Sequence, residues 1–161
     1  MENINFEKTP KQILQNLEKT GRYVFHGSPF RIDKFEPRQA HQSIKKENGE
    51  IEKIPDGEPA VFTSPFADTA IFMAVISKKN APLGMYSGFS ADSKSNNVKF
   101  RATKETMNQI KDEASGYVYV FEKEKFKERN FNESVSHEEV EPVMFIEVTK
   151  KDLPEIEVRD F

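Results

Sequence analysis

The 161-residue chain contains no cysteine, and this absence excludes several kinds of chemistry. Disulfide bonds, thiolate nucleophiles and cysteine-ligated zinc sites cannot form. Histidine is scarce as well, because the chain has only His26, His41 and His137, and none of them belongs to an HExxH motif. A catalytic metal site is therefore not expected.

The chain also lacks a long hydrophobic run and an excess of basic residues. No window approaches the roughly 18 apolar residues of a membrane span, and residues 1–6 carry neither the basic nor the apolar region of a signal peptide. Lys and Arg total 24 against 27 Asp and Glu, so the net charge is −3. General nucleic-acid and membrane-surface binders are basic. We therefore expect a cytoplasmic protein with no membrane partner and no general nucleic-acid partner.

Tryptophan is absent, and hydrophobic residues make up 36% of the chain against 32% charged residues. This balance predicts a single domain over residues 1–161, with a modest core and a heavily charged surface. Phenylalanine occurs 14 times, so its rings are expected to fill much of that core.

Helical patterns occur in three places. Thr9 as N-cap and Pro10 at the first helical position predict a short amphipathic helix over residues 10–20. A second helix is expected over residues 65–77, with its small and apolar residues along one face. A third is expected over residues 104–114, where helix formers dominate.

Strands are predicted where β-branched and aromatic residues gather, at residues 22–26, 60–63, 98–102, 117–121, 144–148 and 156–159. Residues 79–97 and 126–132 are expected to be irregular, and residues 38–58 to form a loop with a small hairpin at Asn48-Gly49. Most strands come late in the chain and do not alternate with helices. This order predicts an α+β fold with a largely antiparallel sheet.

Two of the predicted strands end in small polar residues and a proline. The first ends in His26, Gly27 and Ser28, and the second contains Phe62 and Thr63. Such strand ends are suited to be two walls of a cleft, where a neutral imidazole offers one donor and one acceptor. The alternative is a surface histidine at a strand end that serves no ligand.

An acidic segment precedes the last strong strands and contains Glu133, Glu138, Glu139 and Glu141. A carboxylate from this segment could point into the cleft. The other interpretation is a solvated acidic loop. The residues alone leave both interpretations open.

Taken in order, the three pieces resemble the ADP-ribosyltransferases of the diphtheria-toxin and poly(ADP-ribose) polymerase type. The likeness covers about residues 22–150. It is carried by Phe25-His26-Gly27-Ser28, by the second strand running into a helix, and by the segment that begins at Glu133. It implies a split antiparallel β-sandwich with peripheral helices, and NAD bound as substrate in the cleft between the half-sheets.

The resemblance also implies roles for individual residues. In the family, the first-motif histidine hydrogen-bonds the adenosine ribose, and the glycine and serine after it contact the nicotinamide carboxamide. These roles would fall on His26, Gly27 and Ser28. The family glutamate stabilises an oxocarbenium-like transition state. That role would fall on Glu133 as the catalytic residue, with Glu138 and Glu139 as the alternatives if the alignment is shifted.

The second motif departs from the family pattern, which has a tyrosine that stacks on the nicotinamide. Phe62 on the strand and Phe72 on the following helix are the aromatic candidates, and Thr63 lies beside the first of them. Phenylalanine can stack but has no hydroxyl group. Arg38, in the loop after the first motif, is either a partner for the NAD pyrophosphate or a surface arginine.

The function implied by the resemblance is an NAD-dependent ADP-ribosyltransferase that modifies a protein or nucleic-acid acceptor of unknown identity. A toxin or phage effector of this kind would be expected to have a neutralising protein partner. The first alternative is a degraded module that binds a nucleotide or a protein without chemistry. The second is a relative of the RNA 2′-phosphotransferases, which the acidic charge balance disfavours.

Overall fold

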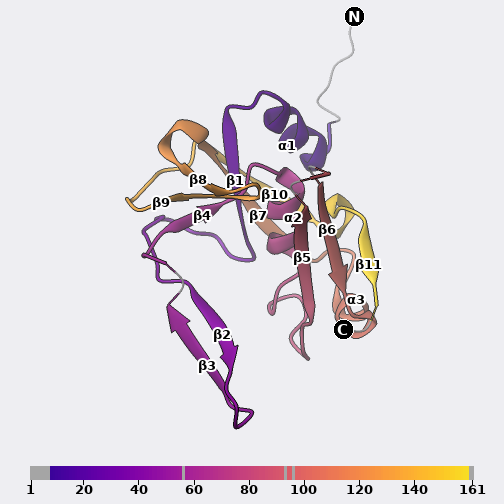
Figure 1. Cartoon of the computed structure of the whole chain (residues 1–161). Helices are drawn as coiled ribbons and strands as arrows, with labels where there is room; N and C mark the ends of the chain where they lie inside the picture. Colours follow the sequence, from indigo (N-terminus) through magenta and orange to yellow (C-terminus); the bar gives the residue numbers. More distant parts are fainter. Residues whose placement is uncertain (1–7, 56, 93, 96, 160–161) are drawn as a thin grey trace, which may run out of the picture.

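The computed structural model describes residues 8–55, 57–92, 94–95 and 97–159, so residues 1–6, where no signal peptide is expected, lie outside the described part. The described chain is a mixture of a few helices and mostly antiparallel strands, which confirms the predicted α+β class (Figure 1). The helices are α1 (Pro10–Lys19), α2 (Ala67–Val75) and α3 (Lys104–Gln109), with 3-10 turns η1 (Lys123–Lys125) and η2 (Lys150–Asp152). The strands are β1 (Tyr23–Ser28), β2 (His41–Lys45), β3 (Ile51–Pro55), β4 (Val61–Thr63), β5 (Ser87–Asp92), β6 (Asn97–Ala102), β7 (Ser115–Glu122), β8 (Lys127–Asn130), β9 (Glu133–Ser136), β10 (Met144–Thr149) and β11 (Ile156–Val158).

Two three-stranded antiparallel sheets lie next to each other and position the site. The first has the order β1-β7-β10, and the second has the order β4-β9-β8. An isolated bridge joins them, in which Phe25 N donates to Ser64 O at 2.7 Å and Ser64 N donates to Phe25 O at 2.8 Å. Beyond this bridge β1 and β4 are no longer paired as a ladder, and the sheets part.

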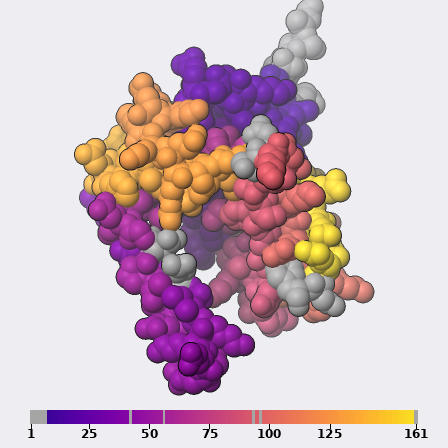
Figure 2. Space-filling view, viewed as in Figure 1, coloured from indigo at the N-terminus to yellow at the C-terminus, as the bar shows by residue number. Residues whose placement is uncertain are grey.

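A third sheet, in the order β11-β6-β5, flanks the first two, and β11 runs parallel to β6 as the exception to the antiparallel rule. The β2–β3 hairpin stands out from the body of the molecule (Figures 1 and 2). Its turn lies where the sequence predicts it. Gly49 has a φ of +87°, which glycine adopts readily, and Asn48 Oδ1 accepts the Glu50 N–H at 3.0 Å.

Helix α2 is the central element of the core, and the prediction that only one of its faces is apolar is wrong. Seven of its residues are buried: Ala67, Thr69, Ala70, Ile71, Phe72, Ala74 and Val75. The helix packs directly on β1 and β7 because Gly27 and Gly116 lie beneath it. A Cβ atom on either glycine would clash with a backbone carbonyl of α2, that of Ala70 or of Ala74 respectively.

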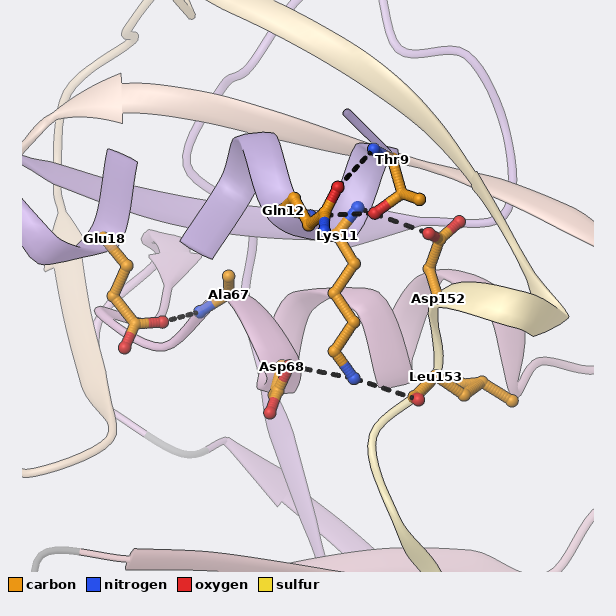
Figure 3. Close-up of polar contacts among 8 residues, drawn as sticks. All are labelled: Thr9, Lys11, Gln12, Glu18, Ala67, Asp68, Asp152 and Leu153. Atoms are coloured by element: carbon orange, nitrogen blue, oxygen red, sulfur yellow. Dashed lines mark hydrogen bonds and ion pairs between the residues drawn. The ribbon is translucent and has the colours of Figure 1, made fainter. Parts of the chain in front are cut away.

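Helix α1 begins as predicted, with a capping box between Thr9 and Gln12. Its other contacts fasten α2 and the C-terminal segment (Figure 3). Glu18 Oε1 accepts the N–H of Ala67 at 2.7 Å, at the start of α2. The N-cap residue of α2 makes no capping hydrogen bond with its own side chain. Lys11 N donates to Asp152 Oδ1 at 3.2 Å. Helix α1 thus holds α2 in place from outside the core.

Three sequence predictions need correction. Residues 79–97 and 126–132 are not irregular throughout, because β5 and β8 form within them and pair with β6 and β9. The third helix ends at Gln109, earlier than predicted, because Ile110 leaves the helical conformation and enters the core. Within the described residues no helix is long and apolar enough to cross a membrane.

Candidate functional site

A cavity of about 630 Å³ opens where the first and second sheets part. Strand β1, strand β4, helix α2, strand β5 and the turn between β8 and β9 all contribute to it. Its lining comprises Phe25, His26, Gly27, Phe62, Thr63, Ser64, Thr69, Ala70, Met73, Phe89, Ala91, Asn130, Phe131, Asn132 and Glu133. The predicted residues His26, Gly27, Phe62, Thr63 and Glu133, which are up to 107 positions apart in sequence, therefore meet in one cavity.

His26 lies at the point where the sheets part. Its Nδ1 is 2.7 Å from the carbonyl oxygen of Phe62, which can only accept, so Nδ1 carries the proton. Burial lowers the pKa of His26 against the opposing effect of this hydrogen bond, and the charge of Arg38 lowers it further. The imidazole is therefore neutral at pH 7, and its Nε2 is left as a hydrogen-bond acceptor.

The two residues after His26 are largely used by the fold. Gly27 lines the cavity, but the close approach of α2 already requires a glycine there. Ser28 is buried and does not line the cavity. Its Oγ donates to Phe30 O at 2.8 Å and accepts the Phe30 N–H at 3.1 Å, which closes a local turn.

Some residues of the second motif lie at the cavity and others lie in the core. The Phe62 ring lines the cavity, with the Arg129 guanidinium 5.8 Å from its centroid. Thr63 also lines it, although its hydroxyl donates to Ser134 O at 2.9 Å across the β4–β9 pair. Phe72 does not line it, because its ring is 3% exposed and packs on Phe100 at a centroid distance of 4.9 Å.

The acidic segment places one of its four glutamates at the cavity. Glu133, at the start of β9, lines it, whereas Glu138 and Glu139 are exposed beyond the end of β9. The Glu133 Oε1 atom is 3.3 Å from Arg129 Nη1 and 3.4 Å from Asn130 Nδ2. The carboxylate is thus accessible from the cavity and already has two partners on its own hairpin.

Arg38 lies near the cavity but not in its lining. Its backbone pairs with Ala60, with N···O distances of 3.0 and 2.9 Å. Together with His26 and Phe62 it lines a separate, smaller cavity of about 150 Å³. Arg38 is therefore on the far side of these two residues from the larger cavity.

Several residues that line the cavity do not belong to any of the sequence motifs. Asn132 is buried, and its Oδ1 accepts hydrogen bonds from Ser64 Oγ at 2.7 Å and Thr69 Oγ1 at 3.0 Å. Phe89 and Phe131 add aromatic surface from β5 and from the turn. The position of Asn132 next to Glu133 was the one available clue, because neighbours of a functional residue in a turn often share its site.

The cavity is thus lined by the neutral imidazole of His26, by Glu133, and by apolar residues that include four phenylalanines. Its volume lies in the range of small-molecule sites. Across the described part of the chain, no three His, Asp or Glu side chains gather as a metal site would require. Comparison of the chain with protein-family models, curated proteins and solved structures finds no match.

Proposed function

We propose that the cavity binds NAD and that the protein transfers its ADP-ribose group to an acceptor. One observation carries the proposal. A neutral histidine, His26, and a carboxylate, Glu133, line one cavity between two antiparallel sheets, together with several phenylalanines. Two half-sheets that part around a dinucleotide are what the resemblance to ADP-ribosyltransferases implies. We extend this to the finer fold class, a split antiparallel β-sandwich with peripheral helices.

The chemistry follows from the properties of these groups. Nε2 of the neutral His26 accepts a hydrogen bond from a ribose hydroxyl of NAD. The bond between nicotinamide and its ribose breaks with both electrons leaving on nicotinamide, and positive charge develops on the sugar. The Glu133 carboxylate stabilises that charge. The nucleophile of the acceptor then forms the new bond to the sugar carbon and loses its proton.

The apolar lining supports the proposal in a second way. Phe62, Phe89 and Phe131 offer ring faces to the flat, cationic nicotinamide ring, although none carries the hydroxyl of the family tyrosine. Phe72 is not part of this proposal, because its ring is in the core. Ser28 is not part of it either, since its hydroxyl is buried in a local turn.

The test is release of nicotinamide from NAD by wild type and by Glu133→Gln. Because the substitution keeps the shape but removes the charge, we expect release to fall about a hundredfold or more. Binding of NAD should change little. Nicotinamide release followed by chromatography and NAD binding followed by calorimetry give the two readings.

Glu138→Gln is the matched control, since it removes one negative charge from the same segment at an exposed position. We expect this variant to release nicotinamide at the wild-type rate. If Glu138→Gln loses nicotinamide release while Glu133→Gln keeps it, the catalytic role belongs to Glu138 instead. Absence of NAD binding by wild type would contradict the proposal as a whole.

One observation favours a binding module as the second candidate. Glu133 is already engaged by Arg129 and Asn130, and a carboxylate so occupied is less available to a sugar. This candidate predicts that NAD binds to wild type without release of nicotinamide, whether or not an acceptor protein is added. The same two assays therefore separate the candidates.

A further inference from the structure

Asn132 lines the cavity and has two hydrogen-bond donors on Nδ2 for which no described residue is an acceptor. Its side chain is 7% exposed, and its Oδ1 accepts from the hydroxyls of Ser64 and Thr69. Among the residues that the structure describes, none accepts a hydrogen bond from its Nδ2. Nδ2 is not among the fully buried atoms that lack a hydrogen-bond partner, and Asn132 lines the cavity. A molecule in the cavity is therefore the partner that this amide calls for.

The surrounding bonds fix which way the amide points. Ser64 Oγ accepts the N–H of Phe66 at 3.1 Å, which leaves its own hydrogen for Asn132 Oδ1. If the amide were turned over, the hydroxyl hydrogens of Ser64 and Thr69 would both lose their acceptor. Asn132 N also donates to Asn130 Oδ1 at 2.9 Å, which holds the turn. The fold therefore orients the Nδ2 hydrogens before any ligand arrives.

We propose that Asn132 donates from Nδ2 to an oxygen on the nicotinamide-ribose half of NAD, an assignment that rests on the proposed function. Asn132 and Glu133 are consecutive and line the same cavity, so the groups that they contact belong to the same half of the dinucleotide. The ribose of that half carries hydroxyl groups, and their oxygens are the atoms that we expect to accept a hydrogen bond from the amide. His26, which presents an acceptor, serves the other half.

The test is calorimetric binding of NAD and of ADP to wild type and to Asn132→Asp. Aspartate keeps an oxygen that accepts both hydroxyl bonds, but it replaces the donor with an anionic oxygen. We expect NAD to bind at least about tenfold more weakly. ADP lacks the nicotinamide ribose, and it should bind to Asn132→Asp as it does to wild type. Asn108→Asp, at an exposed position of α3, adds the same charge elsewhere and should leave NAD binding unchanged.

A purely structural Asn132 gives a different result. Since the bonds to Ser64 and Thr69 survive in Asn132→Asp, NAD affinity would then stay at the wild-type value, and the inference would be overturned. Equal weakening of ADP and NAD would overturn the assignment to the nicotinamide half. Circular dichroism checks the fold. If Asn132→Asp does not fold, Asn132→Ser, which also lacks the amide, is expected to show the same selective loss.

Failure of the proposed function can be told apart from failure of this inference. If wild type binds NAD and Asn132→Asp binds it equally well, the assignment of Asn132 is wrong and the NAD site stands. If wild type binds neither NAD nor ADP, the proposed function is wrong and the inference falls with it.

Discussion

The cavity has two walls that differ in how the fold uses their polar groups. The core wall comes from β1 and α2 and includes His26, Gly27 and Ala70, whereas the turn wall consists of residues 130–133. In the core wall, packing against α2 accounts for Gly27, and Nδ1 of His26 is taken up by a backbone carbonyl. In the turn wall, the Glu133 carboxylate pairs with Arg129 and Asn130 of its own hairpin, but no described residue accepts a hydrogen bond from Nδ2 of the neighbouring Asn132.

This difference separates residues that the fold requires from residues that we propose for ligand binding. The His-Gly-Ser motif contributes most to the resemblance, yet contacts inside the protein explain much of it. Contacts inside the described protein do not account for the Nδ2 hydrogens of Asn132, for which no described residue is the acceptor. Substitutions in the core wall should therefore lower stability, and those in the turn wall should lower binding at nearly unchanged stability.

Gly27→Ala should have the largest effect on stability. The new Cβ would clash with the backbone carbonyl of Ala70, and backbone cannot move aside as a flexible side chain can. We expect a loss of about 3 kcal/mol or more, toward the upper end for overpacked cores. Chemical denaturation at neutral pH measures it.

Gly88→Ala in β5 is the matched control for this prediction. The nearest atom to a Cβ at Gly88 is Arg101 Nε at 3.9 Å, an ordinary contact, and its φ is not positive. We expect a change of less than about 1 kcal/mol, because alanine only replaces a glycine within a strand. Equal stability of both variants would show that α2 does not pack on β1 as described.

Glu18→Ala should have a smaller effect on the same wall, through the support that α1 gives to α2. Glu18 accepts the N–H of Ala67 in place of an N-cap side chain, and loss of a cap costs about 1 kcal/mol. Burial raises the pKa of Glu18, which means that burial disfavours the charged form of its carboxyl group. Glu18→Gln keeps the acceptor without the charge and should unfold at a higher temperature than Glu18→Ala. If the two variants unfold together, the hydrogen bond to Ala67 contributes nothing.

The sequence allowed the elements with strong local signals to be predicted. Helix α1 was recognisable from Thr9 and Pro10, and the hairpin turn from Asn48-Gly49. Strands β1, β7 and β10 were predictable from their runs of aromatic and β-branched residues. Strands β5 and β8 were missed because they are polar and mostly exposed, and pairing with β6 and β9 alone makes them strands.

The candidate site was predictable only where a motif marked it. His26 and Glu133 were found, because a family pattern gave their order along the chain. Phe72 was placed in the site since a helix pattern cannot say which face meets a ligand and which meets the core. Asn132 was missed because its role depends on two hydroxyls more than 60 positions earlier in the chain.

His26 belongs to the core wall through the hydrogen bond from its Nδ1 to Phe62 O. We expect the smallest loss of stability here, because the loss appears only below neutral pH, where the unfolded chain takes up a proton that the folded chain does not. Burial and Arg38 lower its folded pKa, while in the unfolded chain it takes up a proton near its ordinary value of about 6.5. Its contribution is therefore full above that pH and is lost as pH falls toward the folded pKa. Denaturation between pH 7.5 and about 5 should show wild type losing more stability than His26→Asn, whose amide keeps a donor for Phe62 O.

His41→Asn, on the exposed hairpin, should follow the wild-type profile. Parallel losses in wild type and His26→Asn would assign the acid sensitivity to another group.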